Sequence, residues 1–137
     1  MSTFSNRGVP VPQGKDTGGG LQTTTEHTGP AVVLHVDGEI DASNGKAWQH
    51  LIIQGAAETV APGPFVIDVR GLDFMGSVSY AALAREAVHC RRRGVNMRLV
   101  SGQRIVARTI IACGLRRLLP MYTTVEDALS SPIRPNG

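Results

Sequence analysis

Two serine hydroxyls lie where an apolar strand turns into a helix, and they are the side chains of this chain best suited to covalent modification. The segment Gly76-Ser77-Val78-Ser79 follows an apolar, β-branched run over residues 65–69 and precedes apolar residues at helical spacing over residues 80–90. A serine at a helix N-terminus is exposed, and its hydroxyl can cap the helix or carry a phosphate. The pattern therefore predicts a working loop at the carboxyl end of a strand, where open α/β sheets carry their sites.

Other residues that could catalyse reactions or bind metals are scattered. The four histidines make no metal-binding spacing with cysteines or carboxylates, and no serine lies in a GxSxG motif. We expect His35, inside an apolar run, to be a satisfied core or sheet-face residue. Cys90 and Cys113 form neither a CxxC motif nor a zinc spacing. The sequence therefore predicts a non-enzymatic protein with no catalytic residue, no metal site and no cofactor.

Alternating apolar patterns predict the elements that position this loop. Strands are expected at residues 21–26, 31–36, 65–69, 95–100 and 118–122. Helical spacing is found at residues 47–56, 80–90, 105–111 and 124–129. Ser43 or Asn44 is expected to cap the first of these helices and Thr124 the last, whereas Gly94 and Gly114 are suited to end the second and third.

Strands that alternate with helices predict an α/β fold with right-handed crossovers. We expect a mostly parallel sheet of four to five strands, with one antiparallel strand at its start and about four helices packed against it. The folded domain is expected at residues 21–129. Residues 1–20 and 130–137 are rich in Gly, Pro and polar residues and predict disordered tails.

Composition argues against two classes of partner. The net charge is +3, but much of the cationic charge lies at Arg91–Arg93 and Arg116–Arg117, near predicted helix ends, where it complements the helix dipole. Aromatic residues make up only 4% of the chain, which gives no stacking platform for nucleic acid. No apolar run approaches the roughly 20 residues that span a bilayer. Without a signal-peptide pattern, the expected location is the cytoplasm.

Several segments together resemble a known family. They are GEID at residues 38–41, VIDVRGLDFM at residues 66–75, the serine-bearing start of the next helix, and ACGL at residues 112–115. In this order and spacing they resemble STAS domains over about residues 21 to 129, and more narrowly the bacterial anti-sigma factor antagonists. The resemblance implies the STAS fold and a role in the regulation of transcription, in stress responses for example.

The resemblance also implies a partner and a switch. An antagonist of this family binds an anti-sigma factor that is a serine kinase of the GHKL type, and so frees a sigma factor. Phosphorylation of a serine at the start of the second helix releases the complex. We expect such a protein to be a monomer or a weak dimer.

The chain departs from the family pattern at the switch. The family typically has Asp-Ser-Ser-Gly or Asp-Ser-Thr-Gly here, with the second hydroxyl phosphorylated. This chain has Gly76 in place of the Asp, Val78 in place of the acceptor and Ser79 in place of the last Gly. Three interpretations follow: phosphorylation at Ser77, phosphorylation at Ser79, or partner binding with no serine switch.

The resemblance further implies a docking surface around this loop. Asp41 matches an acidic residue of the GEID turn that lies near the serine loop, although it could also simply cap the following helix. Ser43 and Asn44 follow it in the same turn. Met75 and Tyr80 flank the loop and are candidates for buried anchors of an interface. The predicted partner-binding set is Asp41, Ser43, Asn44, Met75, Gly76, Ser77, Val78, Ser79 and Tyr80.

Two alternatives stay open at this point. If the second and third helices are neighbours, Cys90 and Cys113 at their ends could form a reversible disulfide that replaces the serine switch. The chain could also be a STAS scaffold or nucleotide-binding module of a stress-signalling complex, because helix N-termini attract phosphates.

Overall fold

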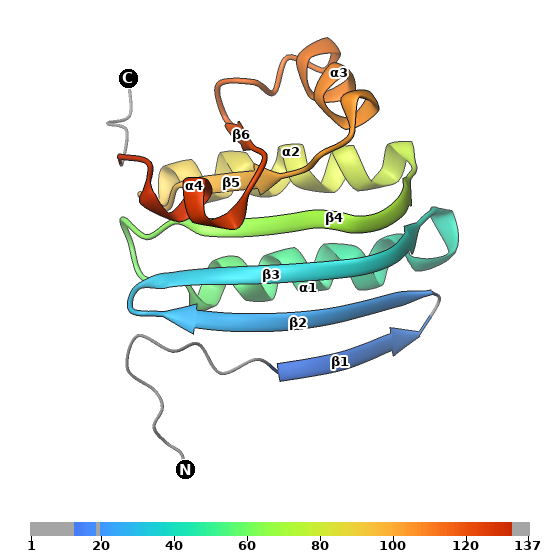
Figure 1. Cartoon of the computed structure of the whole chain (residues 1–137), viewed down its shortest axis with the longest axis horizontal. Coiled ribbons are helices and arrows are strands. Elements are labelled where there is room, and N and C mark those ends of the chain that lie inside the picture. The colour runs from blue at the N-terminus through green and yellow to red at the C-terminus, as the bar shows by residue number, and fades with distance from the viewer. Residues whose placement is uncertain (1–12, 19, 133–137) are drawn as a thin grey trace.

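A computed structural model of the chain describes residues 13–18 and 20–132 (Figure 1). Its elements in order are β1 (Gln13–Gly18), β2 (Leu21–Thr28), β3 (Ala31–Ile40), the 3-10 helix η2 (Ala42–Asn44), α1 (Gly45–Glu58), β4 (Phe65–Met75), α2 (Ser77–Arg92), β5 (Met97–Val100), α3 (Arg104–Ala112), β6 (Met121–Tyr122) and α4 (Val125–Ser130). Within the described residues, six strands form one sheet in sequence order.

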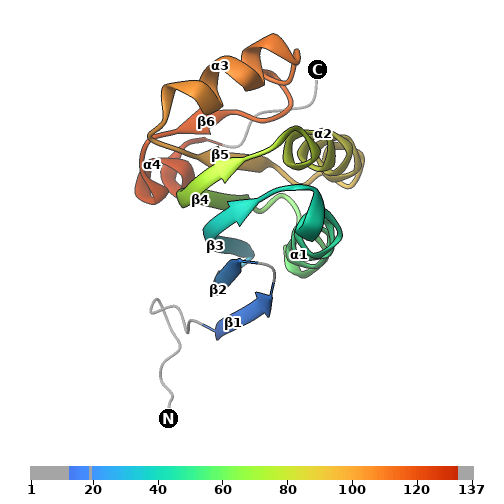
Figure 2. The same cartoon turned by 90° about the vertical axis from the view of Figure 1, so that its right-hand side faces the viewer.

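The sheet is antiparallel at its start and parallel afterwards. β1 pairs with β2 and β2 with β3 in antiparallel fashion, whereas β3, β4, β5 and β6 run parallel. Helices α1 and α2 cover one face of the sheet and α4 lies on the other, with α3 beyond the edge formed by β5 and β6 (Figure 2). The carboxyl ends of β3 and β4 therefore meet the starts of α1 and α2 at one edge.

Apolar side chains fill both faces of the central strands. The larger core lies under α1 and α2 and includes Trp48 and Leu83, both fully buried. A smaller cluster lies under α4, around Ala128. Adjacent residues of β3, β4 and β5 point into the two cores alternately: Leu34, Ile67 and Leu99 into the larger, and Val33, Val66 and Val100 into the smaller. Burial on both faces explains why these strands are continuous apolar runs.

The predicted α/β fold, with a mostly parallel sheet and four helices, is confirmed. Gly94 and Gly114 follow α2 and α3 with φ of +76° and +73°, the left-handed conformation that ends a helix at glycine. Thr124 caps α4, because its hydroxyl oxygen accepts a hydrogen bond from the Asp127 amide at 3.1 Å. Asn44 is the N-cap residue of α1, one of the two predicted, but its side chain makes no capping hydrogen bond to that helix, and Ser43 lies within η2.

Several strands differ in number or length from those predicted. Residues 13–18, predicted as part of a disordered tail, form β1, which brings the strand count above the expected four to five. β1 joins the edge of the sheet by pairing its backbone with β2. Because backbone pairing needs no alternation of apolar residues, the sequence contains no pattern that predicts this strand. β3 and β4 extend to Ile40 and Met75, well beyond their predicted ends, whereas β6 is shorter than predicted. Ser130, predicted as the start of the other tail, is the last residue of α4. The predicted tail residues 1–12, 19 and 133–137 lie outside the described residues.

Candidate functional site

The turn after β3 and the start of α2 meet at the carboxyl edge of the sheet. Ile40 and Met75, the last residues of β3 and β4, are paired in register. The Gly76 amide then donates to the Ile40 carbonyl at 2.8 Å. A Cβ atom on Gly76 would lie 3.7 Å from the Asp41 Cα. The predicted contact between the GEID turn and the serine loop is therefore present.

Asp41 organises the turn. Its carboxylate accepts hydrogen bonds from the Ser43 amide at 2.9 Å and the Ser43 hydroxyl at 2.6 Å, which caps η2. These bonds from Ser43 lower the pKa of Asp41, so the carboxylate is ionised at neutral pH. In return, Asn44 Oδ1 accepts from the Asp41 amide at 3.0 Å, and Asn44 Nδ2 donates to the Glu39 carbonyl at 2.8 Å. Asn44 is buried, so it shapes the turn, whereas Ser43 is exposed.

The two candidate phosphorylation sites differ in access. Ser77, the first residue of α2, is exposed and follows Gly76, which caps the helix with no side-chain bond. Ser79 is fully buried, and its hydroxyl donates to the Gly76 carbonyl at 2.5 Å. The Ser79 carbonyl also accepts from the Trp48 indole nitrogen at 3.1 Å, in the core. The structure therefore argues against Ser79 as an acceptor, because a kinase could not reach its hydroxyl.

Val78, at the usual acceptor position, packs against the start of α1. A Cβ atom added to Gly45 would lie 2.9 Å from Val78 Cγ2, so only glycine leaves room for this contact. The side chain of Val78 stays 37% exposed. Val78 thus presents an apolar surface where the family pattern has a hydroxyl.

Phe74 is a candidate contact residue that the sequence reasoning missed. Leu72 pairs with Gly38 and Phe74 with Glu39, so Asp73 is an extra residue in β4, a β-bulge. Leu72 is buried, and in a regular strand Phe74 would share its face. The bulge turns Phe74 outward instead, and its side chain is 54% exposed. In sequence, Leu72, Asp73 and Phe74 show the ordinary alternation of a strand, so the bulge left no local signal, and the predicted strand ended at Val69.

Tyr80 is not available as an anchor of an interface, and Met75 is available only in part. Tyr80 is buried, burial raises the pKa of its hydroxyl, and its side chain is hydrogen-bonded to Thr109 of α3. It therefore joins α2 to α3 and offers no side chain to a partner. Met75 is half-buried and packs against the core. We name the exposed or half-exposed set the carboxyl-edge surface: Asp41, Ser43, Phe74, Ser77 and Val78.

The two cysteines are not a redox pair in this structure. Both thiols are free; Cys90 is buried and Cys113 is exposed. Cys113 lies close enough to Tyr80 to influence the pKa of its hydroxyl. Tyr80 and Cys90 are ten residues apart on α2, which is about 15 Å along a helix, whereas a disulfide needs Cα atoms within roughly 7 Å. The predicted neighbourhood of the two helix ends is wrong because α3 ends beside the start of α2.

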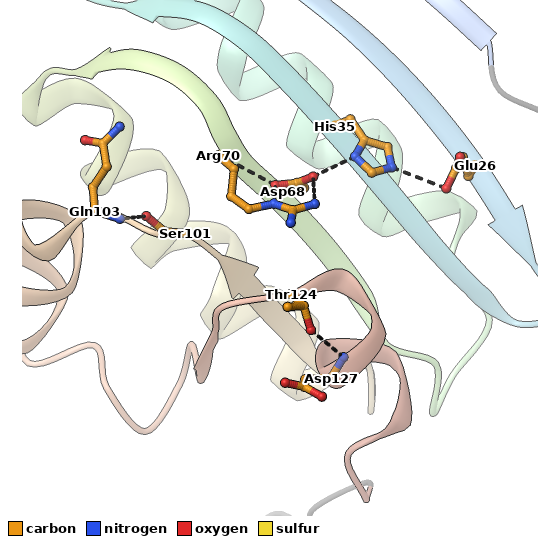
Figure 3. A network of polar contacts seen from close by, with 8 residues as sticks. All are labelled: Glu26, His35, Asp68, Arg70, Ser101, Gln103, Thr124 and Asp127. Atoms are coloured by element: carbon orange, nitrogen blue, oxygen red, sulfur yellow. Dashed lines mark hydrogen bonds and ion pairs between the residues drawn. The ribbon is translucent and has the colours of Figure 1, made fainter.

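A charged network lies on the sheet face opposite α1 and α2 (Figure 3). His35 Nδ1 is 2.7 Å from an Asp68 oxygen, and its Nε2 is 3.2 Å from a Glu26 oxygen. Arg70 Nε and Nη2 donate to Asp68 at 2.9 and 3.0 Å. The network joins β2, β3 and β4, which fits the expectation that His35 is a satisfied sheet-face residue. Its partners were not predicted, because they lie on other strands.

The described residues offer little for ligand chemistry. No group of three His, Cys, Asp or Glu side chains among them could hold a metal ion. A shallow cleft of about 270 Å³ between the start of α3 and β6 is lined by Gln103, Arg104 and Tyr122, among others. It is below the usual size of a small-molecule site, roughly 300–1,000 Å³. None of the helices in residues 20–132 is long and apolar enough to cross a membrane.

Comparisons with known proteins give one consistent result. Residues 22–128 match the family model of the STAS domain. The chain is 52% identical over 111 residues to the anti-sigma-F factor antagonist RsfA of Mycobacterium tuberculosis, a match that covers 81% of this chain and 87% of that protein. It is 31% identical over 108 residues to the anti-sigma-F factor antagonist RsfB of the same organism, covering 79% and 85%. The crystal structure of an anti-sigma factor antagonist from Mycobacterium paratuberculosis superposes with a TM-score of 0.68 at 26% identity, covering 85% and 97%.

Proposed function

Because the chain belongs to the STAS domain family, we propose that it is an anti-sigma factor antagonist, which binds an anti-sigma factor and so frees a sigma factor for transcription. The relatives that match over most of their length are named as antagonists of this kind. They are regulatory proteins, and this chain is accordingly assigned a binding role and no reaction.

The observation that carries the proposal is the composition of the carboxyl-edge surface. Phe74 and Val78 expose apolar side chains beside the ionised Asp41 and the hydroxyls of Ser43 and Ser77. An exposed aromatic anchor surrounded by polar groups is the arrangement from which protein interfaces draw most of their binding energy. The core and the capped η2 turn hold these groups in place, so little conformational entropy is lost on docking.

We propose the anti-sigma-F factor, the target named for the relatives, as the first partner to test. Isothermal titration calorimetry should detect binding of the full chain to the purified anti-sigma-F factor of M. tuberculosis. The variant Phe74→Ala should weaken the complex by about tenfold or more, as expected for an anchor residue. The matched control is Val60→Ala, because Val60 is 62% exposed and its amide bonds to Pro30, at the other end of the sheet. Equal effects of the two substitutions would contradict the assignment of the surface.

The regulation of this complex rests on Ser77. Ser77 is the serine of the loop that a kinase can reach, and a phosphate there would lie on the amide groups at the start of α2, which tolerate negative charge. The same charge would be desolvated inside a docked interface, so modification would release the partner and leave the fold intact. This proposal implies that the partner is a serine kinase.

Mass spectrometry separates this switch from constitutive binding. After incubation with the anti-sigma factor and ATP, a phosphate on Ser77 that is absent from Ser77→Ala supports the switch. An unmodified chain that stays bound in the presence of ATP supports binding without a serine switch.

A further inference from the structure

Helix α3 carries an exposed stripe that the proposed function does not use. Ile105, Arg108 and Ala112 are exposed and, with Thr109, follow the spacing i, i+3, i+4 and i+7 that places residues on one helix face. Ile105 is 62% exposed, which is unusual for an isoleucine. The opposite side of the helix is anchored by the buried Val106 and Ile110, so the exposed stripe is fixed in direction.

This stripe adjoins the carboxyl-edge surface. The Thr109 side chain is hydrogen-bonded to Tyr80 in the first turns of α2. Ser77 lies three residues before Tyr80 and so shares its side of α2. At the start of α3, Gln103 Nε2 donates to the Leu72 carbonyl of β4 at 2.9 Å, two residues before Phe74. Two contacts therefore tie α3 to the two elements that present Ser77 and Phe74.

The charge of α3 is one-sided. The helix carries Arg104 and Arg108, both exposed, and no acidic residue. The ion pairs found among the described residues involve other cations, at His27, His35, Arg70 and His89. A cationic side chain beside an exposed isoleucine on one stripe fits a partner segment that combines carboxylates with an apolar side chain.

We propose that the Ile105–Arg108–Ala112 stripe is a second part of the interface and binds an acidic, apolar-bearing segment of the anti-sigma factor. The proposal rests on the proposed function, since the anti-sigma factor is its occupant. Phe74 and Val78 would supply one half of the contact and α3 the other. The stripe would then decide which of several related anti-sigma factors the chain accepts, because its charge rejects a basic segment.

A matched pair of isoleucines on two different helices tests the stripe. Ile53 is 44% exposed and lies on α1, outside the stripe. With the M. tuberculosis anti-sigma-F factor as the probe, Ile105→Ala should weaken binding about five- to tenfold and Ile53→Ala less than about twofold. Arg108→Glu should weaken it by about tenfold or more and reduce the dependence of affinity on salt.

The outcomes separate the two proposals. If the unmodified chain does not bind the probe, the proposed function fails and the stripe fails with it. If the unmodified chain binds and Phe74→Ala weakens the complex, but Ile105→Ala and Ile53→Ala have equal effects, the proposed function stands and the stripe alone is overturned. The thermal midpoint of each variant should stay near that of the unmodified chain, because both isoleucines are exposed. A change in self-association, with no change in affinity for the probe, would identify the stripe as a contact between copies of this chain and would also overturn the proposal.

Discussion

Replacing Asp68 with asparagine should remove a measurable pH dependence from the stability of the fold. The Asp68 side chain is 8% exposed and accepts hydrogen bonds from His35, at 2.7 Å, and from Arg70. Burial alone would raise the pKa of Asp68, but the hydrogen bonds from His35 and Arg70 outweigh it and hold that pKa below its ordinary value. The hydrogen bond to Asp68, followed by that to Glu26, raises the pKa of His35 against its partial burial.

The expected size follows from these contacts. Hydrogen bonds to charged groups contribute about 1.5–3 kcal/mol each, and losing one member of a buried ion pair costs about 3–5 kcal/mol. The His35 side chain is 28% exposed, so solvent screens part of this energy. We therefore expect Asp68→Asn to lose about 3 kcal/mol at pH 6, where His35 is charged, and to melt about 10 °C lower.

The direction of the pH dependence is fixed by the two shifts. His35 contributes fully below its unfolded pKa of 6.5, and the contribution is lost as the pH rises through its higher folded pKa. Asp68 contributes above its unfolded pKa of 3.8, and that contribution is lost only as the pH falls well below this value. The unmodified chain should therefore lose stability as the pH rises above 6.5 and through the raised folded pKa of His35, and Asp68→Asn should lose much less.

Urea unfolding measures this directly, since the single tryptophan, Trp48, is fully buried and reports on the core. The unfolding free energy should be recorded at pH 6, 7, 8 and 9. Asp37→Asn is the matched control, because Asp37 is an exposed carboxylate on β3. Parallel pH profiles for the unmodified chain and Asp68→Asn would refute the assignment of the network.

Three further outcomes are expected. Val78→Asp should abolish binding to the anti-sigma factor in calorimetry because it puts a charge into the interface, whereas Val88→Asp, equally exposed at 37% on α2, should bind normally. Arg98→Met should lower the free energy of unfolding by about 2–4 kcal/mol and speed amide hydrogen exchange in α4, because the buried guanidinium donates to three carbonyls at the end of that helix. Unchanged exchange rates would contradict this role. Mild oxidation should leave Cys90 and Cys113 unlinked in mass analysis under non-reducing conditions, because burial raises the pKa of Cys90 to about 12, and a disulfide would contradict their separation.

The ends of helices could be predicted from the sequence where a single residue sets the end. Gly94 and Gly114 ended helices as expected, and Thr124 capped α4, because each acts through its own backbone or a neighbour three residues away. The apolar runs of the central strands were predictable because burial on both faces leaves a continuous pattern.

The candidate site was less predictable because its properties depend on contacts between distant segments. Burial of Tyr80 depends on where α3 returns, and the pairing of His35 with Asp68 depends on the register of β3 against β4. The bulge at Asp73 appears only when the two strands are aligned. Position in the sequence predicted a functional loop at Ser77, but it could not show which neighbouring side chains face outward.

The bulge in β4 means that the proposed binding surface depends on the number of residues in this strand as well as on their types. Phe74 faces outward because one surplus residue, Asp73, interrupts the alternation of the strand. Deleting Asp73 would keep the types of all the other residues in the loop. It would nevertheless turn the aromatic ring of Phe74 to the buried face of the sheet and change the direction of the side chains next to it. Loops exchanged between related proteins should therefore transfer partner preference only when the spacing from Leu72 to the start of α2 is kept to the residue.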